Sequence, residues 1–153
     1  MEELNKLEEI KKIAGKIMAV DFGDVRTGLA VSDPSRLIAS GIGYISPGGI
    51  EKTADAVAVA AKENGAVAVV VGLPVNMDGS HGGRAQRCEK FARLLKERVD
   101  VPVAVFDERM TTMTASRYLN ETNTKGKKRK QVIDTLSAQI ILQNCLDRLK
   151  YMS

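Results

Sequence analysis

Four acidic residues lie where strands or a helix are predicted to begin or end. Asp21 ends an apolar segment, Asp107 and Glu108 end another, and Asp134 lies in the first turns of a long predicted helix. Carboxylates that come within a few ångströms repel one another, and a divalent metal ion relieves that repulsion. Oxygen ligands with no His or Cys nearby favour Mg²⁺ or Mn²⁺. If folding gathers these acids, they predict a site for hard divalent ions.

Such a site would suit the cleavage of phosphodiester bonds. Two ions about 4 Å apart stabilise both the attacking water and the leaving oxygen, and they lower the pKa of the water. No histidine base is then needed, which fits a chain whose single histidine, His81, lies in a glycine-rich loop. Each acid also has an ordinary explanation. Asp21 could cap a turn, Glu108 could pair with Arg109, and Asp134 could favour a helix N-terminus.

The elements that would position these acids alternate between strands and helices. The first half is predicted to hold a strand–turn–strand unit over 16–33, a strand over 41–46 and a helix from Ile50 to the stop at Asn64-Gly65. The continuous, valine-rich apolar run over 66–72 predicts a central strand that is covered on both faces. The second half is predicted to hold a helix with Cys88 to Val99 along one side, a strand over 101–106, a short helix from Thr111 or Thr112 to Leu119, and a helix over about 130–150. This order indicates an α/β fold, a mixed sheet with helices on both faces.

Two details of this pattern bear on the site. Gly23 and Gly28 bracket the first turn, where a positive φ or a close backbone approach is expected. On a helical wheel, Asp134 heads the apolar stripe of Ala138, Ile141, Cys145 and Leu149, which predicts that it faces the sheet.

The composition favours one soluble globular domain. The 153 residues suffice for one well-filled core, with 44% hydrophobic and 27% charged residues. No apolar run reaches membrane-spanning length, the first residues lack the apolar centre of a signal peptide, and the two cysteines form no metal or disulfide motif. A cytoplasmic location is therefore expected. Residues 2–14 carry apolar positions at helical spacing, which predicts an amphipathic helix that Gly15 ends.

Basic residues concentrate before the last helix, where the predicted loop KGKKRK begins at Lys125. Cations beside a phosphodiester-cleaving site would hold the nucleic-acid backbone, although a solvated loop would look the same. The predicted substrate-binding residues are Arg26, Arg109, Lys125, Lys127, Lys128, Arg129 and Lys130, and Arg84 and Arg87 could extend them. With three Tyr, three Phe and no Trp, base stacking is predicted to be minor. The sequence therefore predicts that the protein recognises the shape of structured RNA or branched DNA.

Four segments together resemble the signature blocks of a known family. DFGDVRTGLAVSD, VVVGLPVNMDGS, FDERMTT and IDTLSAQIILQNCLD are similar, in this order from Lys16 to about Leu149, to blocks of the YqgF (RuvX) family. Its members are ribonuclease H-like proteins described as Holliday junction resolvases and as pre-16S rRNA nucleases. The resemblance implies a ribonuclease H-like, five-stranded mixed sheet whose first three strands are antiparallel, and a nuclease dependent on Mg²⁺ or Mn²⁺.

The resemblance also assigns roles to residues. It implies that Asp21, Glu108 and Asp134 are the catalytic residues and metal ligands, with Asp107 a close fourth. The fourth strand ends in Gly72-Leu73-Pro74 without a carboxylate, so Glu108 would have to reach the site from the neighbouring strand. Residues 1–15 have no counterpart in the family core. They are interpreted as an N-terminal amphipathic helical extension, and 16–153 as the ribonuclease H-like nuclease domain.

Several functions remain open at this stage. The expected one is 5′ end processing of pre-16S rRNA in ribosome biogenesis, and the alternative is Holliday junction resolution in DNA recombination and repair. A resolvase should act as a homodimer with two centres, whereas an RNA trimmer could work as a monomer. Another class is a phosphate-loop ATP-binding domain of the actin and hexokinase type, although 153 residues leave no room for its second domain. A non-catalytic nucleic-acid-binding module is the last alternative.

Overall fold

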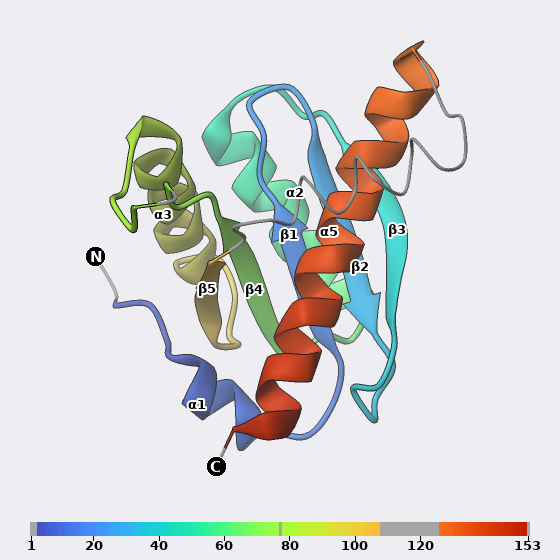
Figure 1. Ribbon diagram of the computed structural model, residues 1–153, viewed down its shortest axis with the longest axis vertical. Coiled ribbons are helices and arrows are strands. Elements are labelled where there is room, and N and C mark those ends of the chain that lie inside the picture. The colour runs from blue at the N-terminus through green and yellow to red at the C-terminus, as the bar shows by residue number, and fades with distance from the viewer. Residues whose placement is uncertain (1–2, 77, 108–125, 153) are drawn as a thin grey trace.

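A five-stranded mixed sheet forms the centre of the protein (Figure 1). The computed structural model describes residues 3–76, 78–107 and 126–152, with the backbone alone for residues 126–135. The strands are β1 (Ile17–Asp21), β2 (Thr27–Ser32), β3 (Ala39–Ile45), β4 (Ala68–Leu73) and β5 (Val103–Asp107), in the spatial order β3-β2-β1-β4-β5. β1, β2 and β3 pair antiparallel, and β4 pairs parallel with β1 and β5. The predicted mixed sheet with three antiparallel strands is confirmed.

Helices cover both faces of this sheet, as predicted (Figure 1). Helices α2 (Ile50–Glu63) and α3 (Gly83–Lys96) pack on one face, and α5 (Gly126–Tyr151) packs on the other together with the short α1 (Leu7–Lys11). Side chains alternate along each strand between the two faces. In β1, Met18 and Val20 therefore join the core under α2 and α3, and Ile17 and Ala19 join the core under α5.

β4 lies at the centre of the parallel part of the sheet and is buried along its whole length. Its valine-rich sequence predicted such a strand, because a strand covered on both faces has no polar side. The register of β1 and β4 places Val20 beside Val71, and that of β4 and β5 places Leu73 beside Asp107. The carboxyl ends of these three strands therefore meet at one edge of the sheet, called here the carboxyl edge.

The N-terminal segment departs from its prediction. A helix was expected over residues 2–14, but within the described part of this range, 3–14, the helix covers Leu7–Lys11 alone. Before it, the backbone N–H of Asn5 donates to the Val103 carbonyl at 2.8 Å, and the Val103 N–H donates to Asn5 Oδ1 at 3.0 Å. The chain thus pairs with the edge strand β5, which satisfies exposed backbone groups that a longer helix would leave open. Ile10 is fully buried under α5.

The last helix begins earlier than predicted. It was expected from about residue 130, but α5 begins at Gly126 and so includes Lys127, Lys128, Arg129 and Lys130. The prediction of a basic loop is therefore wrong for this part of KGKKRK. Lys and Arg have high helix propensity, and Gly126 is the first residue of the helix, where a glycine lowers helix stability only a little. The short helix predicted from Thr111 or Thr112 to Leu119 lies outside the described residues.

Candidate active site

Asp21 occupies the carboxyl end of β1, where it is half-buried. It shares the face of Ile17 and Ala19, because side chains two residues apart in a strand lie on the same face. That is the face covered by α5. Across the antiparallel pair, Asp21 lies opposite Gly28, which has no side chain. The predicted position of Asp21 at a strand end is confirmed, and its catalytic role stays a prediction.

Asp107 lies at the same edge but on the other face of the sheet. In β5, Val103 belongs to the core under α2 and α3, and Val105 packs against that core. Alternation places Asp107 with these two valines, whereas Ala104 belongs to the core under α5. Asp107 therefore projects away from the face that carries Asp21.

Helix α5 carries Asp134 toward the carboxyl edge. Near its C-terminal end, the Leu149 carbonyl accepts a hydrogen bond from Lys11 Nζ at 2.6 Å, close to the start of β1. The helix thus runs opposite to β1, and its first half lies toward the end of β1 (Figure 1). The predicted stripe is confirmed from Ala138 onward, since Ala138, Ile141, Cys145 and Leu149 are all buried. The backbone of Asp134 lies one turn before Ala138.

The rest of the predicted acid cluster lies beyond what the structure describes. Glu108, like Arg109 and Lys125, lies outside the described residues, and Asp134 is described in its backbone alone. Within the described part of the chain, no three His, Cys, Asp or Glu side chains gather as metal ligands. Asp21 is the described side chain that fits the predicted ion, because it offers carboxylate oxygens at a strand end on the face that α5 covers.

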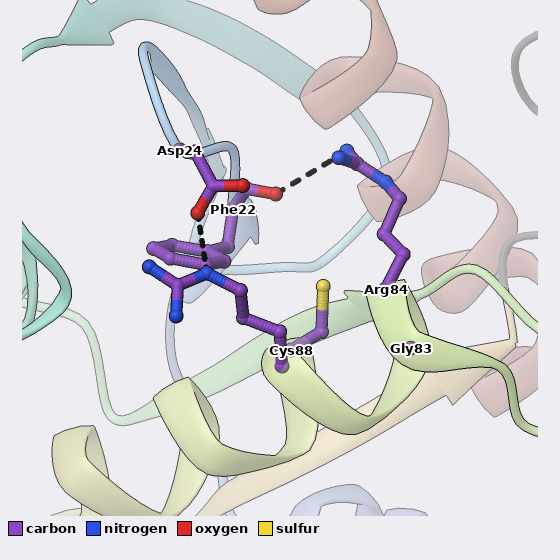
Figure 2. Close-up of a pocket in the computed structure, with 6 residues that line it drawn as sticks. Phe22, Asp24, Gly83, Arg84 and Cys88 are labelled. Atoms are coloured by element: carbon purple, nitrogen blue, oxygen red, sulfur yellow. Dashed lines mark hydrogen bonds and ion pairs between the residues drawn. The ribbon is translucent and has the colours of Figure 1, made fainter.

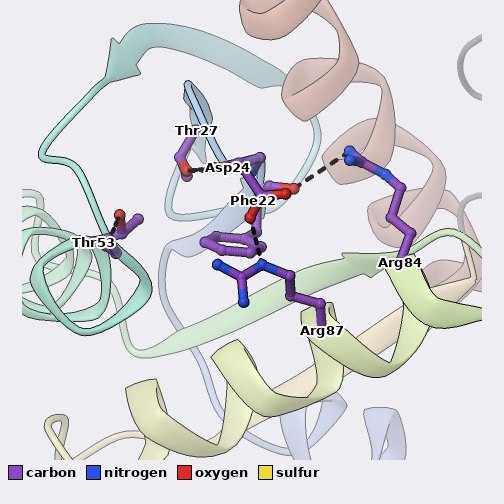
Figure 3. A network of polar contacts seen from close by, with 8 residues as sticks. Phe22, Asp24, Thr27, Thr53, Arg84 and Arg87 are labelled. Carbon is purple, nitrogen blue, oxygen red and sulfur yellow. Dashed lines mark hydrogen bonds and ion pairs between the residues drawn. The ribbon is translucent and has the colours of Figure 1, made fainter.

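The hairpin after Asp21 is held in one conformation by its own residues (Figure 3). The Thr27 hydroxyl donates to the Gly23 carbonyl at 3.3 Å and lies 3.4 Å from the Gly23 N–H, which donates to it. Thr27 itself is buried. A Cβ on Gly23 would lie 2.3 Å from the Arg26 carbonyl oxygen, so only glycine fits this turn. This confirms the close backbone approach that the sequence predicted.

A pocket of about 310 Å³ lies between this hairpin and the start of α3 (Figure 2). Arg84 Nη2 donates to the Phe22 carbonyl at 3.4 Å, and Arg87 Nε forms an ion pair with Asp24. The Arg87 guanidinium also lies 5.8 Å from the centre of the Phe22 ring. Sequence reasoning proposed the two arginines as phosphate contacts but missed their partners, because Phe22 and Asp24 lie more than sixty residues earlier in the chain.

On the opposite side of the hairpin, Arg26 contacts strand β3. Its guanidinium carbon lies 5.6 Å from the centre of the Tyr44 ring. The predicted cations Lys127, Lys128, Arg129 and Lys130 belong to the first turns of α5.

The glycine-rich loop that follows β4 is ordered by its own hydrogen bonds. The Asn76 N–H donates to the Ser80 carbonyl at 2.9 Å, and the Ser80 N–H donates to Asp78 Oδ1 at 2.9 Å. The hydrogen bonds from Ser80 lower the pKa of Asp78. His81 Nδ1 lies 2.7 Å from a Glu89 carboxylate oxygen, in a half-exposed pair on the surface. His81 is thus held to α3 at the surface of the protein.

Known proteins are similar to this chain along most of its length. A sequence model of the RuvX family, described as Holliday junction resolvase, matches residues 15–148. A protein of Pelotomaculum thermopropionicum, named as a candidate pre-16S rRNA nuclease, is 41% identical over 133 residues, which cover 86% of each chain. A protein of Paracoccus denitrificans with the same name is 38% identical over 151 residues, 99% of this chain and 96% of its own.

Solved structures agree with the fold. RuvC of T. thermophilus, solved in complex with a Holliday junction substrate, superposes with a TM-score of 0.54 at 14% identity, over 88% of this chain and 95% of its own. At that identity the likeness concerns the fold, which is the ribonuclease H-like one that the sequence predicted. The family match and the identity to the relatives together decide the assignment. This chain belongs to the RuvX family.

Proposed function

We propose that this protein is a metal-dependent nuclease that processes the 5′ end of pre-16S rRNA. The observation that carries this proposal is Asp21, a half-buried carboxylate at the carboxyl edge of a sheet whose chain belongs to a nuclease family. The names of its relatives, at about 40% identity over most of the chain, support rRNA as the substrate. In open α/β sheets, ligands bind outside the carboxyl ends of the strands, where Asp21 lies.

Asp21, Glu108 and Asp134 are the proposed ligands of Mg²⁺ or Mn²⁺. Support for Glu108 over Asp107 comes from β5, where Ala104 faces α5 and Asp107 does not. Bound ions would supply Lewis-acid stabilisation of the charge that develops on the phosphate oxygens. The carboxylates would hold the ions in place at the carboxyl edge of the sheet.

The chain's cations would hold the substrate strand. Arg26 lies on the hairpin directly after Asp21, and Lys127, Lys128 and Arg129 belong to the first turns of the helix that carries Asp134. Lys125, Lys130 and Arg109 complete the proposed set. Contacts of this kind position the phosphate backbone without reading its sequence. The two buried cysteines form no disulfide, which suits a reducing compartment, and we propose the cytoplasm. In the described part of the chain, no helix is long and apolar enough to cross a membrane.

Holliday junction resolution is the second candidate, because the matching family carries that description. The chemistry would be the same, and the substrate and the assembly would differ. A resolvase would act as a homodimer that presents two Asp21 centres to paired strands, and an rRNA nuclease could act as a monomer.

The test compares cleavage of precursor 16S rRNA with cleavage of a four-way DNA junction, each with Mg²⁺ or Mn²⁺. We expect cleavage of the rRNA near its 5′ end, and a loss of more than about 100-fold in kcat for Asp21→Asn, since even outer-shell partners of metal sites cost 10–100-fold. The matched control is Asp100→Asn, because Asp100 is exposed before β5 at the other edge of the sheet.

The outcomes separate the candidates. Faster cleavage of the junction would favour the resolvase. Nucleic-acid binding without metal-dependent cleavage of either substrate would favour a non-catalytic module. Equal activity of Asp21→Asn and the wild type would contradict the proposed site.

A further inference from the structure

Tyr44 lies in one row across the sheet with Asp21. Asp21 is opposite Gly28 in the pair of β1 and β2, and Gly28 is opposite Tyr44 in the pair of β2 and β3. Neighbouring strands lie about 4.8 Å apart, so the backbones of Asp21 and Tyr44 are about 10 Å apart. Directly opposite residues share a face of the sheet. Tyr44 therefore projects on the same face as Asp21, the face that α5 covers.

A bulge in β3 gives Tyr44 this direction. Leu29 is opposite Gly43 and Ala30 is opposite Gly41, so Ile42 is an extra residue with no partner in the register. Without it, Gly43 would take the place opposite Gly28, and Tyr44 would project toward α2. Bulges re-aim side chains and are frequent beside active sites.

The ring of Tyr44 is accessible and accompanied by a cation. The residue is 38% exposed, and the Arg26 guanidinium lies 5.6 Å from the ring centre. The other described aromatic rings are differently placed. Phe22 and Phe91 are buried and stack on each other at 4.4 Å, Phe106 packs against the core under α5, and Tyr151 lies at the last residue of α5. Within the described residues, Tyr44 is thus the exposed aromatic side chain beside Asp21.

We propose that Tyr44, with Arg26 beside its ring, stacks an unpaired base of the substrate strand next to the phosphate that is cleaved. The proposal rests on the proposed nuclease function and adds a positioning residue to it. Gly28, between Asp21 and Tyr44 in this row, has no side chain, and Arg26 would supply a charge for a neighbouring phosphate. Any base can stack on an aromatic ring, so the contact requires an unpaired nucleotide and no particular sequence.

The first test uses fluorescence. The chain has no Trp, so Tyr44→Trp creates a single tryptophan fluorophore at the proposed platform. The matched control is Tyr151→Trp, because Tyr151 is 81% exposed and also has a cation near its ring, Lys150 at 5.7 Å. Both variants carry Asp21→Asn to prevent cleavage.

The probes are a single-stranded RNA from the 5′ flank of 16S rRNA and a four-way DNA junction. We expect both nucleic acids to be bound. The single-stranded RNA, whose bases are unpaired, should quench the tryptophan fluorescence of the Tyr44→Trp variant and leave that of the Tyr151→Trp variant unchanged. The junction, whose bases are paired, should leave the fluorescence of both variants unchanged.

The second test measures binding and kinetics. Tyr44→Ala should weaken binding and raise KM by about 5- to 100-fold, while kcat changes little. Tyr44→Phe keeps the ring and should bind like the wild type. If Tyr44 instead served the structure and not binding, the substitutions would lower the melting temperature of both variants or reduce kcat.

The results separate this proposal from the nuclease function. If the wild type cleaves but the Tyr44→Trp variant is not quenched and Tyr44→Ala keeps its KM, the platform is refuted and the nuclease stands. If the wild type neither binds nor cleaves nucleic acid, both proposals fail. Should Tyr44→Ala not fold, the quenching of the Tyr44→Trp variant decides alone.

Discussion

At the scale of single residues, neighbouring acids have unlike surroundings. Asp21 and Asp107 both end parallel strands at the carboxyl edge, yet they project on opposite faces of the sheet. A strand turns successive side chains to opposite sides, so a shift of one position decides which layer a carboxylate meets. Asp107 thus projects away from the face that carries Asp21, and the proposed partner of Asp21 is Glu108 instead.

Gly23 is predicted to tolerate no side chain. In Gly23→Ala, the new Cβ would lie 2.3 Å from the Arg26 carbonyl oxygen, and the hairpin must shift to relieve that contact. We expect a loss of about 1–3 kcal/mol in the free energy of unfolding, the usual cost of overpacking. Urea denaturation measures it. Gly83→Ala is the control, because a Cβ at Gly83 meets no atom within 4 Å and alanine suits the start of α3. Equal stability of the two variants would contradict the contact.

At the scale of elements, the turn from β2 to β3 holds the N-terminal segment to the sheet. Arg36 adopts a left-handed conformation in this turn, with φ of 61°. Its guanidinium donates to the Gly15 carbonyl at 2.7 Å and to the Ile10 carbonyl at 2.9 Å. Burial lowers the pKa of Arg36. The turn thus connects α1 to the end of the sheet at which β1 begins, opposite the carboxyl edge.

The same turn predicts a pH dependence of stability. Asp33 Oδ1 accepts hydrogen bonds from the N–H groups of Ile38 and Leu37, each at 2.8 Å, and Ser35 donates to the other oxygen. These bonds lower the pKa of Asp33 from 3.8 to about 2. A lowered folded-state pKa means that the stabilisation is present above about pH 4 and is lost as the pH falls toward 2.

Urea titrations between pH 5 and pH 2, the window set by that shift, measure this dependence. The slope of unfolding free energy against pH should be smaller in Asp33→Asn than in the wild type. Asp100→Asn, at an exposed position, should keep the wild-type slope. An Asp33→Asn protein with the wild-type slope would show that the turn does not contribute.

At the scale of the whole molecule, positive charge is unevenly placed. The net charge is only +4, but four of the five residues at the start of α5 are basic. Cations at a helix N-terminus are unfavourable with respect to the helix dipole. Nucleic acid bound there would compensate that cost.

Changing Lys127, Lys128 and Arg129 to Ala should weaken nucleic-acid binding and flatten its salt dependence. Each lost phosphate contact should reduce the slope of log K against log salt by about 0.7–0.9. Binding titrations over a range of salt concentrations give this slope. The control replaces Lys12, Lys62 and Lys96, which precede β1, β4 and β5 and so lie at the opposite edge of the sheet. The same slope in the first variant and the wild type would exclude these residues from binding.

The sequence by itself determined the class of fold and most of its elements. The valine run of β4 and the stripe from Ala138 to Leu149 were correctly predicted as buried. The spacing of apolar residues along a strand or helix shows which of its sides is packed away from water. The end of β1 at Asp21 followed from the same pattern. The four motif blocks pointed to the family that the comparisons then showed.

Only the tertiary structure decided how these elements meet. The pairing of Asn5 with Val103, the ion pair of Arg87 with Asp24 and the bulge at Ile42 join segments far apart in the chain, or depend on a partner strand. Local patterns carry no record of such partners, since the same residues suit a turn, a surface or an interface equally well. Register, set by the whole sheet, is what turns Tyr44 to the face of Asp21.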